Sequence, residues 1–228
     1  MSVGVVIPAA GKGKRMGASV SKQFLDLYGE PILIRTLRVV SDHPAVTQTV
    51  VVVGREERAR VESLLAQHGF NSKRVQTVIG GKERQQSVFE GLKALSTRWV
   101  LVHDAVRPFI THDRITALLT GAEETGAAIL AVPVKDTIKE VEEGVVSRTL
   151  ERNRLWAVQT PQAFRRELLL QAHRAADQTV LATDDAMLVE SMGVPVRVVE
   201  GDYANIKLTT KEDWVLAEAI WRKRSSEQ

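Results

Sequence analysis

The first residues that could do chemistry form a glycine-rich turn with basic side chains around it. The turn, residues 8–13, follows a short apolar run at 3–7 that predicts a buried strand. Glycine has no Cβ, so such a turn can bring backbone N–H groups close to an anion, and flanking cations suit a polyphosphate. We therefore predict a nucleoside triphosphate site, the alternative being an ordinary strand-to-helix turn with surface lysines. The residues concerned are Pro8, Ala9, Ala10, Gly11 and Gly13 in the turn, and Lys12, Lys14, Arg15 and Lys22 as cations.

This turn differs from the two best-known phosphate-binding loops. The P-loop requires Gly-Lys-Ser or Gly-Lys-Thr, and neither tripeptide occurs in the sequence. The dinucleotide fingerprint requires G-x-G-x-x-G, but Met16 stands where the third glycine should be, and Gly17 is one residue late. The rest of the chain must therefore decide what the turn binds.

Further polar candidates follow other apolar runs. A second glycine turn, residues 80–84, follows the run at 75–79, and Asp104 follows the run at 99–102. A carboxylate is a hard oxygen ligand, so Asp104 could hold a Mg²⁺ ion that is bound mostly by phosphates. A helix cap or an ion pair with Arg107 explains Asp104 equally well. The remaining polar candidates are Arg107, Thr137, Arg152 and Lys207.

The composition is that of a globular protein and excludes several classes. The 228 residues are 44% hydrophobic and 26% charged, with a formal net charge of +3. Aromatic residues make up only 5% and do not alternate with basic ones, which argues against nucleic-acid binding. No apolar run approaches the roughly 20 residues of a membrane-spanning helix, and no leader pattern is present. There is no cysteine, the five histidines are scattered, and no G-x-S-x-G occurs. We expect a cytoplasmic enzyme that needs neither a thiolate nor an activated serine.

Strands alternate with helices along most of the sequence. This alternation predicts one α/β domain, residues 1–228, with a Rossmann-like, mostly parallel twisted sheet and helices on both faces. Ligands bind such sheets at the carboxyl ends of the strands, so the turns after residues 7, 79 and 102 should share one edge. Thr111 and Thr183 are expected to cap helices, as is Thr210 with Asp213. The strands are expected at 3–7, 49–53, 75–79, 99–102, 127–132, 155–159 and 194–199.

Residues 133–154 break this pattern. Apolar residues alternate with charged ones on both sides of a turn at 142–144, which predicts a β-hairpin. The hairpin has too few apolar residues for a core of its own, and an isolated hairpin is marginally stable in water. We therefore expect an arm that packs either on a second subunit, giving a homodimer, or back on its own domain.

Taken together, the motifs resemble a known family. The opening residues, Pro-Ala-Ala-Gly-x-Gly-x-Arg-Met at 8–16 and Lys-Gln-Phe-Leu at 22–25, resemble the signature of sugar-phosphate nucleotidyltransferases. Within that superfamily, later stretches resemble the 2-C-methyl-D-erythritol 4-phosphate cytidylyltransferases, in order along essentially the whole chain. These stretches are 80–88, 102–108, 136–139, 152–153, 160–162, 183–186 and 205–207, with Val106 where alanine is commoner.

The resemblance implies a reaction and a set of roles. The reaction would join CTP to 2-C-methyl-D-erythritol 4-phosphate with Mg²⁺ and release pyrophosphate, in non-mevalonate isoprenoid biosynthesis. Arg15 and Lys22 would stabilise the transition state at the α-phosphate. Arg152 and Lys207 would position the substrate phosphate, and the arm would exchange between two subunits. The nucleotide would be bound by Pro8, Ala9, Ala10, Gly11, Gly13, Gly81, Ser87 and Asp104, and the second substrate by Arg107, Thr137, Arg152 and Lys207.

Two other functions would use some of the same residues. The nearest rival is a ribitol-5-phosphate cytidylyltransferase, which would share the fold and the nucleotide site. Ala10 argues against it, because that family tends to have glycine at this position. A nucleotide-binding regulatory protein without catalysis is disfavoured because Arg15 and Lys22 are both retained.

Overall fold

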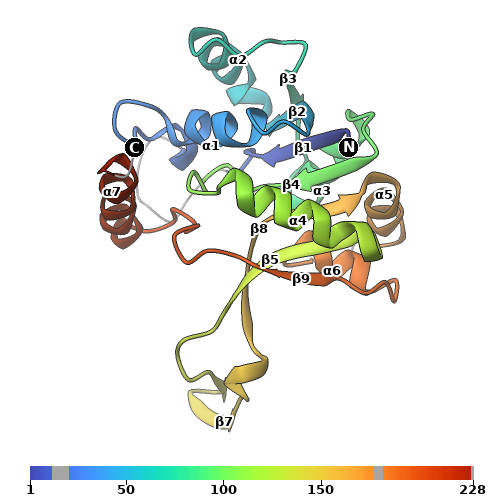
Figure 1. Cartoon of the computed structure of the whole chain (residues 1–228), viewed down its shortest axis with the longest axis vertical. Helices are drawn as coiled ribbons and strands as arrows, with labels where there is room; N and C mark the ends of the chain where they lie inside the picture. The colour runs from blue at the N-terminus through green and yellow to red at the C-terminus, as the bar shows by residue number, and fades with distance from the viewer. Residues whose placement is uncertain (12–20, 177–181, 227–228) are drawn as a thin grey trace.

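A computed structural model describes residues 1–11, 21–176 and 182–226 of the protein. Within these residues the main sheet has seven strands in the order β3-β2-β1-β4-β8-β5-β9, with helices on both faces (Figure 1). Neighbouring strands are parallel except that β8 runs antiparallel to both β4 and β5. This confirms the predicted fold class. The strands are β1 (Val3–Pro8), β2 (Val46–Val53), β3 (Val75–Ile79), β4 (Trp99–Val102), β5 (Ala127–Pro133), β8 (Trp156–Arg165) and β9 (Arg197–Glu200).

The helices form two layers because successive strand residues point to opposite faces of the sheet. One layer packs on the face that holds Val5 and Val51, and the other on the face that holds Val6 and Val50. The valine run of β2 is buried on both faces, as its unbroken apolar sequence predicts. The first layer comprises α1 (Ile32–Ser41), α2 (Arg58–Gln67) and α4 (His112–Thr125), and the second α3 (Arg84–Lys93), α5 (Arg166–Ala175) and α6 (Asp185–Glu190).

Strand β8 is the main departure from the predicted elements. The sequence predicts that it ends at residue 159, before Pro161, but it continues to Arg165. Its pairing with β5 shifts between Ile129, opposite Gln162, and Leu130, opposite Gln159. Thr160 and Pro161 therefore form a bulge, where the ladder does not need the N–H that proline lacks. The bulge turns Thr160 towards the end of β4, where it contacts the site described below.

Helix caps agree with the sequence in two cases and differ in one. The Thr111 side chain accepts the N–H of Arg114 at the start of α4, as predicted. Asp213 and Thr210 also bond to each other's N–H groups at the start of α7 (Lys211–Ser226). The prediction that Thr183 caps the next-to-last helix is wrong, because Asp184 takes the extended cap conformation and its Oδ1 accepts the N–H of Met187 at 3.0 Å.

Helix α7 lies beside the loop that precedes α1 (Figure 1). Its Ala217 packs in a small apolar cluster with Leu27, Ile32, Phe109 and Leu208. The C-terminal helix thus packs against segments from near both ends and from the middle of the chain. In the part of the chain that the structure describes, no helix is both long and apolar enough to span a membrane.

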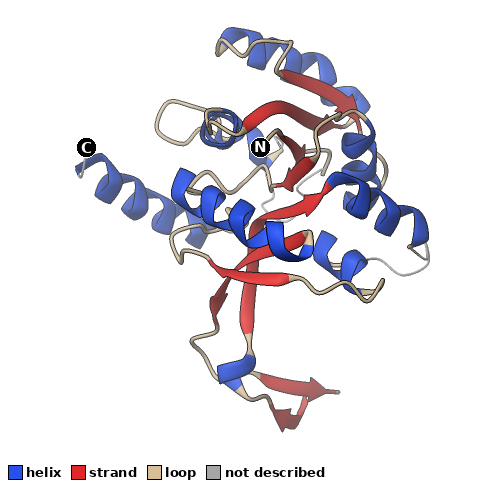
Figure 2. Cartoon of the chain, turned by 45° about the vertical axis from the view of Figure 1, so that its right-hand side comes forward, coloured by secondary structure: helices blue, strands red, loops and turns tan. Residues whose placement is uncertain are grey.

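Residues 133–154 form the predicted arm. Strands β6 (Lys139–Glu142) and β7 (Val145–Thr149) pair antiparallel in a separate two-stranded sheet. The arm projects away from the main sheet, as the views in Figures 1 and 2 agree. Every residue of β7 is exposed, so the expected alternative of an arm folded back onto its own domain is not what this chain adopts.

Candidate active site

The turns after β1, β3 and β4 lie at one edge of the sheet, as the sequence predicts. Two adjoining cavities of about 240 and 310 Å³ open there. Arg84, Asp104 and Lys207 line both cavities. The first cavity is also lined by Pro8, Ala9, Ala10, Gly11, Lys22, Gln23, Gly81, Lys82, Glu83, Ser87, Ala105 and Val106. Gly13 and Arg15, two predicted site residues, lie outside the described residues.

The second glycine turn is shaped by close contacts that a side chain would prevent. A Cβ on Gly80 would lie 2.5 Å from Ser87 Oγ, and a Cβ on Gly81 would lie 2.4 Å from Gln86 Cβ. The Gln86 side chain closes the turn by accepting the N–H of Lys82 at 2.9 Å. Ser87 is buried below the turn in α3. These contacts bring bare backbone to the wall of the first cavity, where the predicted nucleotide ligands Gly81 and Ser87 lie.

Lys22 enters the same cavity from a 3-10 turn, Lys22–Phe24. Its Nζ donates to the carbonyl oxygen of Thr209 at 3.2 Å, and Asp213 holds that segment by accepting from the Thr209 N–H at 2.6 Å. The neighbouring Gln23 is buried and donates to the carbonyl oxygen of Ala9 at 2.9 Å. Gln23 therefore ties the predicted transition-state lysine to the first glycine turn, a role that its sequence position alone does not reveal.

Asp104 is the charged centre of the site. Its Oδ2 lies 2.8 Å from Lys207 Nζ and 3.6 Å from Arg107 Nε, and its Oδ1 lies 3.6 Å from Arg84 Nε. Burial alone would raise the pKa of this carboxyl, but attraction to these cations, first Lys207, lowers the pKa to about 2. Asp104 is therefore ionised at neutral pH. The ion pair with Arg107 that the sequence allowed is present.

The backbone of Asp104 is held by His103 and the bulge in β8. The Thr160 Oγ1 accepts the Asp104 N–H at 3.0 Å and lies 3.1 Å from His103 Nδ1. The other ring nitrogen, Nε2, lies 3.1 Å from the carbonyl oxygen of Arg107. Burial lowers the pKa of His103 to about 4, so the ring is neutral, donates from Nε2 to the carbonyl and accepts the Thr160 hydroxyl at Nδ1. These bonds fix the turn that presents Asp104.

Lys207 and Arg107 belong to one hydrogen-bonded unit. Arg107 Nη1 donates to the carbonyl oxygen of Asn205 at 2.7 Å, and the buried Asn205 amide donates to the carbonyl oxygen of Thr160 at 2.9 Å. Burial lowers the pKa of Arg107, although Asp104 opposes that shift. Arg107 therefore both lines the second cavity and supports the segment that carries Lys207.

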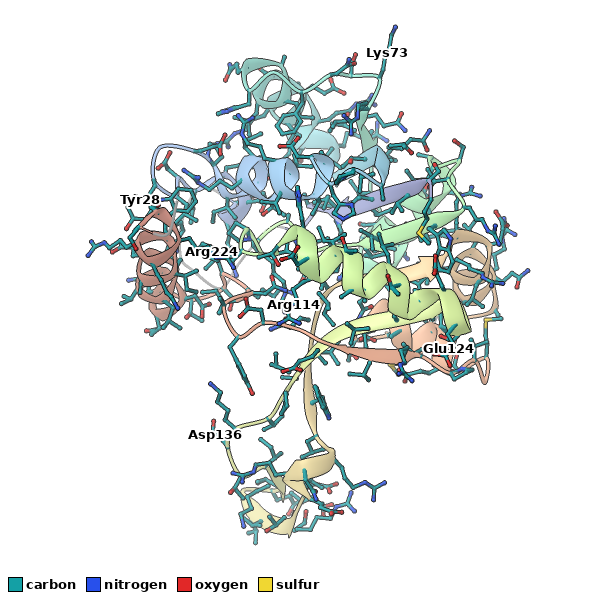
Figure 3. The ribbon with its side chains drawn as sticks, viewed as in Figure 1. Tyr28, Lys73, Arg114, Glu124, Asp136 and Arg224 are labelled. Atoms are coloured by element: carbon teal, nitrogen blue, oxygen red, sulfur yellow. The ribbon has the colours of Figure 1, made fainter. Side chains whose placement is uncertain are left out.

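Thr137 and Arg152, the other two predicted substrate residues, are not brought to this site by their own chain. Both lie on the arm, where Arg152 Nη1 donates to the carbonyl oxygen of Lys135 at 2.9 Å, and neither lines either cavity. Asp136, the neighbour of Thr137, lies on the arm beyond the main sheet (Figure 3). The structure thus separates the predicted site into a part at the sheet edge and a part on the arm.

The described residues supply few metal ligands. They contain no group of three or more His, Cys, Asp or Glu side chains that could hold an ion. Asp104 is ionised and borders both cavities, but its oxygens already contact cations. This donor set fits an ion held chiefly by a bound polyphosphate, with at most one carboxylate from the protein.

The arrangement suits two anionic ligands side by side. Lys22 lies on the first cavity, Arg107 on the second, and Arg84 and Lys207 on both. Cations so placed can cancel the repulsion between a triphosphate and a second phosphate. Arg84 and Thr160 were not predicted as site residues, although each lies in a stretch that carries the family resemblance.

Comparisons with known proteins agree with the geometry. The family model described as 2-C-methyl-D-erythritol 4-phosphate cytidylyltransferase matches residues 3–223. A protein of that name from Bacillus pumilus is 53% identical over 219 residues, 95% of each chain. One from Geobacillus kaustophilus is 50% identical over 230 residues, 100% of each chain.

Solved structures show the same likeness in three dimensions. The crystal structure of 4-diphosphocytidyl-2C-methyl-D-erythritol synthase from Anaerococcus prevotii aligns with a TM-score of 0.84 at 30% identity, covering 97% of this chain and 98% of that one. The 2-C-methyl-D-erythritol 4-phosphate cytidylyltransferase of Thermus thermophilus aligns with a TM-score of 0.79 at 35% identity, covering 97% of this chain and 100% of that one.

The fold, the glycine turns and the cationic edge together define a nucleotidyltransferase. The match along nearly the whole chain gives the finer assignment. The chain belongs to the 2-C-methyl-D-erythritol 4-phosphate cytidylyltransferase family.

Proposed function

We propose that the protein transfers a cytidylyl group from CTP to 2-C-methyl-D-erythritol 4-phosphate. The products are 4-diphosphocytidyl-2-C-methyl-D-erythritol and pyrophosphate, a step of non-mevalonate isoprenoid biosynthesis. The observation that carries the proposal is the pair of adjoining cavities that share Arg84, Asp104 and Lys207. One cavity has the bare turns that a triphosphate needs, and the other has cations for a second phosphate.

The chemistry requires positioning more than proton transfer. A phosphate monoester has a second pKa near 6, so the nucleophile is already an anion at neutral pH. One of its oxygens forms a bond to the α-phosphorus of CTP, the bond from that phosphorus to the bridging oxygen breaks, and pyrophosphate leaves with the electron pair. The protein must cancel the repulsion between the two anions and stabilise the charge that develops at the α-phosphate.

The cations have separate roles in this proposal. Lys22, together with Arg15, stabilises the transition state at the α-phosphate, and its bond to Thr209 sets its direction. Lys207 positions the phosphate of the second substrate, and its contact with Asp104 fixes its place between the cavities. Gly81 and Ser87 hold the nucleotide at the second glycine turn.

We also propose that Mg²⁺ takes part, bound mainly by the CTP phosphates with Asp104 beside it. The ion would reduce the negative charge on the triphosphate. Removal of divalent ions with EDTA should abolish pyrophosphate release, and added Mg²⁺ should restore it. Full activity in EDTA would exclude the ion.

The working unit is proposed to be a homodimer joined through the arm, in a cytoplasmic enzyme. What supports the dimer is the exposure of the apolar residues Val141, Val145 and Val146 on the arm, and the separation of Thr137 and Arg152 from both cavities of their own chain. In this arrangement each arm completes the site of the other subunit. Light scattering during size-exclusion chromatography checks the mass, and cell fractionation checks the location.

A pyrophosphate-release assay with CTP tests the function. We expect release with 2-C-methyl-D-erythritol 4-phosphate, much slower release with ribitol 5-phosphate, and none with CTP alone. Faster turnover of ribitol 5-phosphate would assign the protein to the rival activity. No release with either polyol phosphate would leave a nucleotide-binding protein without this catalysis.

A further inference from the structure

A second buried carboxylate, Asp185, lies behind the charged centre of the site. It is the first residue of α6 and is only 1% exposed. Its Oδ2 lies 2.8 Å from Arg84 Nη1, and its Oδ1 lies 3.5 Å from His173 Nε2. Burial would raise the pKa of the Asp185 carboxyl, but the charge of Arg84 and a contact with His173 lower it. Asp185 is therefore a fixed negative charge that neither cavity wall includes.

Side chains from β8, α5 and α3 hold Asp185 in place, either directly or through His173. The Gln162 side chain in β8 accepts the N–H groups of Asp185 and Ala186, both at 3.2 Å. The ring of His173 in α5 stacks on Phe89 in α3, with centroids 5.7 Å apart. Among the described residues His173 Nε2 has no closer polar partner than Asp185. The carboxylate thus has a defined position relative to α3, which carries Arg84.

Arg84 lies between two carboxylates and uses a different edge for each. Nη1 contacts Asp185 at 2.8 Å, and Nε lies 3.6 Å from Asp104 Oδ1. A guanidinium is a rigid planar fork, so the shorter contact sets the direction of the whole group. Asp185 therefore limits how closely Arg84 approaches Asp104, and Lys207 remains the nearest cation to Asp104 at 2.8 Å.

We propose that Asp185 is a positioning residue for the transfer reaction, because it holds Arg84 away from full pairing with Asp104 and so preserves the Asp104–Lys207 contact between the two cavities. This inference rests on the proposed function and adds a residue to it. Without the negative charge at position 185, Arg84 would turn towards Asp104, where a guanidinium can pair bidentately with a carboxylate. Lys207 would then lose its partner and its place beside the second phosphate.

A crystal structure of Asp185→Asn tests the geometry without reference to activity. We expect Arg84 to move closer to Asp104 than 3.6 Å and Lys207 to move away from its present 2.8 Å. An unchanged Arg84 would overturn the inference. Failure of the proposed function would show separately, as wild-type protein that releases no pyrophosphate.

Steady-state kinetics test whether the loss of the Asp185 charge slows the proposed reaction. Asp185→Asn should lower kcat/KM for the polyol phosphate about 10–100-fold, the range typical of residues that support a site through one intermediate group. The matched control is Glu190→Gln, the same charge change on an exposed residue of the same helix, which should keep wild-type kinetics. Wild-type kcat/KM in Asp185→Asn would overturn the proposal.

A double variant distinguishes a positioning role of Asp185 from a general loss of local structure. In an Arg84→Met background, adding Asp185→Asn should change kcat/KM by less than about twofold, because the residue through which Asp185 acts is gone. A purely structural role would give the full loss in both backgrounds. If Asp185→Asn does not fold, His173→Phe keeps the ring stack on Phe89 and removes the nitrogen beside Asp185. His173→Phe should lower kcat/KM less than Asp185→Asn does, and this loss should disappear in the Arg84→Met background. A loss that remains in the Arg84→Met background would overturn the proposal.

Discussion

The sheet edge and the arm are built in opposite ways. At the edge, Asp104, Ser87 and Asn205 are each less than 10% exposed, and Asp104 and Asn205 contact side chains from other segments of the chain. On the arm, Val145 is 70% exposed and the strands pair only with each other. One chain therefore encloses both cavities at the sheet edge, whereas the arm holds the proposed substrate residues Thr137 and Arg152 away from both cavities of their own chain. The edge therefore depends on internal packing, whereas in the proposed homodimer the arm depends on association with a second subunit.

The largest loss of activity should come from a substitution at the sheet edge. Lys22→Ala removes a cation that faces the α-phosphate in the proposed mechanism, and we expect kcat to fall about 10²–10³-fold, roughly 3–4 kcal/mol of transition-state stabilisation. KM for CTP should change much less, because the interaction is strongest in the transition state. Steady-state kinetics check this split. A rise confined to KM would mean that Lys22 binds substrate and transition state equally.

The arm should contribute less to activity than the sheet edge does, and it should contribute only to the site of the other subunit. Arg152→Ala removes one charged hydrogen-bond donor to the substrate phosphate, which should lower kcat/KM for the polyol phosphate about 10–100-fold. Mixing it with an Arg15→Ala variant should restore activity, since one site of each heterodimer would have both arginines. Verified heterodimers without recovery would show that each site is built from one chain and that the arm does not act on the other subunit.

A smaller effect should follow from filling the second glycine turn. Gly80→Ala places a Cβ 2.5 Å from Ser87 Oγ and 2.9 Å from Val52 Cγ1, and such overpacking costs about 1–3 kcal/mol. Urea unfolding should show this loss, and KM for CTP should rise. The matched control is Gly54→Ala, whose Cβ would meet only Glu57 Oε2 at 3.8 Å. Equal stability of the two variants would show that the turn is less tightly packed than the structure describes.

The smallest change in chain stability is expected on the arm. Val145→Glu should alter the free energy of unfolding by no more than about 0.5 kcal/mol, as for other exposed positions, while shifting the protein towards monomers. Val215→Glu on α7, where the valine is also 70% exposed, is the control and should leave association unchanged. Sedimentation at several protein concentrations measures the association of both variants. A dimer unaffected by Val145→Glu would place the interface elsewhere.

Local patterns in the sequence predicted most of the edge. The strand at 75–79 and the one at 99–102 begin and end where expected, and Asp104 follows the latter as predicted. The predicted strand is too short because a proline usually ends a strand. Only the pairing of β8 with β5 shows that Pro161 lies in a bulge. The antiparallel direction of β8 is likewise a property of the sheet as a whole.

The charge network was beyond prediction from local sequence. The Arg107–Asp104 pair, three residues apart, could be foreseen as one possibility. Arg84 and Asp185 are 101 positions apart, and their contact depends on how α3 and α6 pack on the same face of the sheet. No spacing rule connects such residues, so Arg84 appeared in a motif without a role.

The hydrogen bond from Lys22 to Thr209 links positions 187 apart in the chain. During synthesis, the N-terminal glycine turn leaves the ribosome long before Thr209 and the segment carrying Lys207 do. Strands β1 to β4, which lie next to one another in the sheet and within the first 102 residues, can pair early, but the cationic edge closes only when almost all of the 228 residues have emerged. A prematurely terminated chain could therefore fold part of its core and still lack the edge at which we propose that CTP binds.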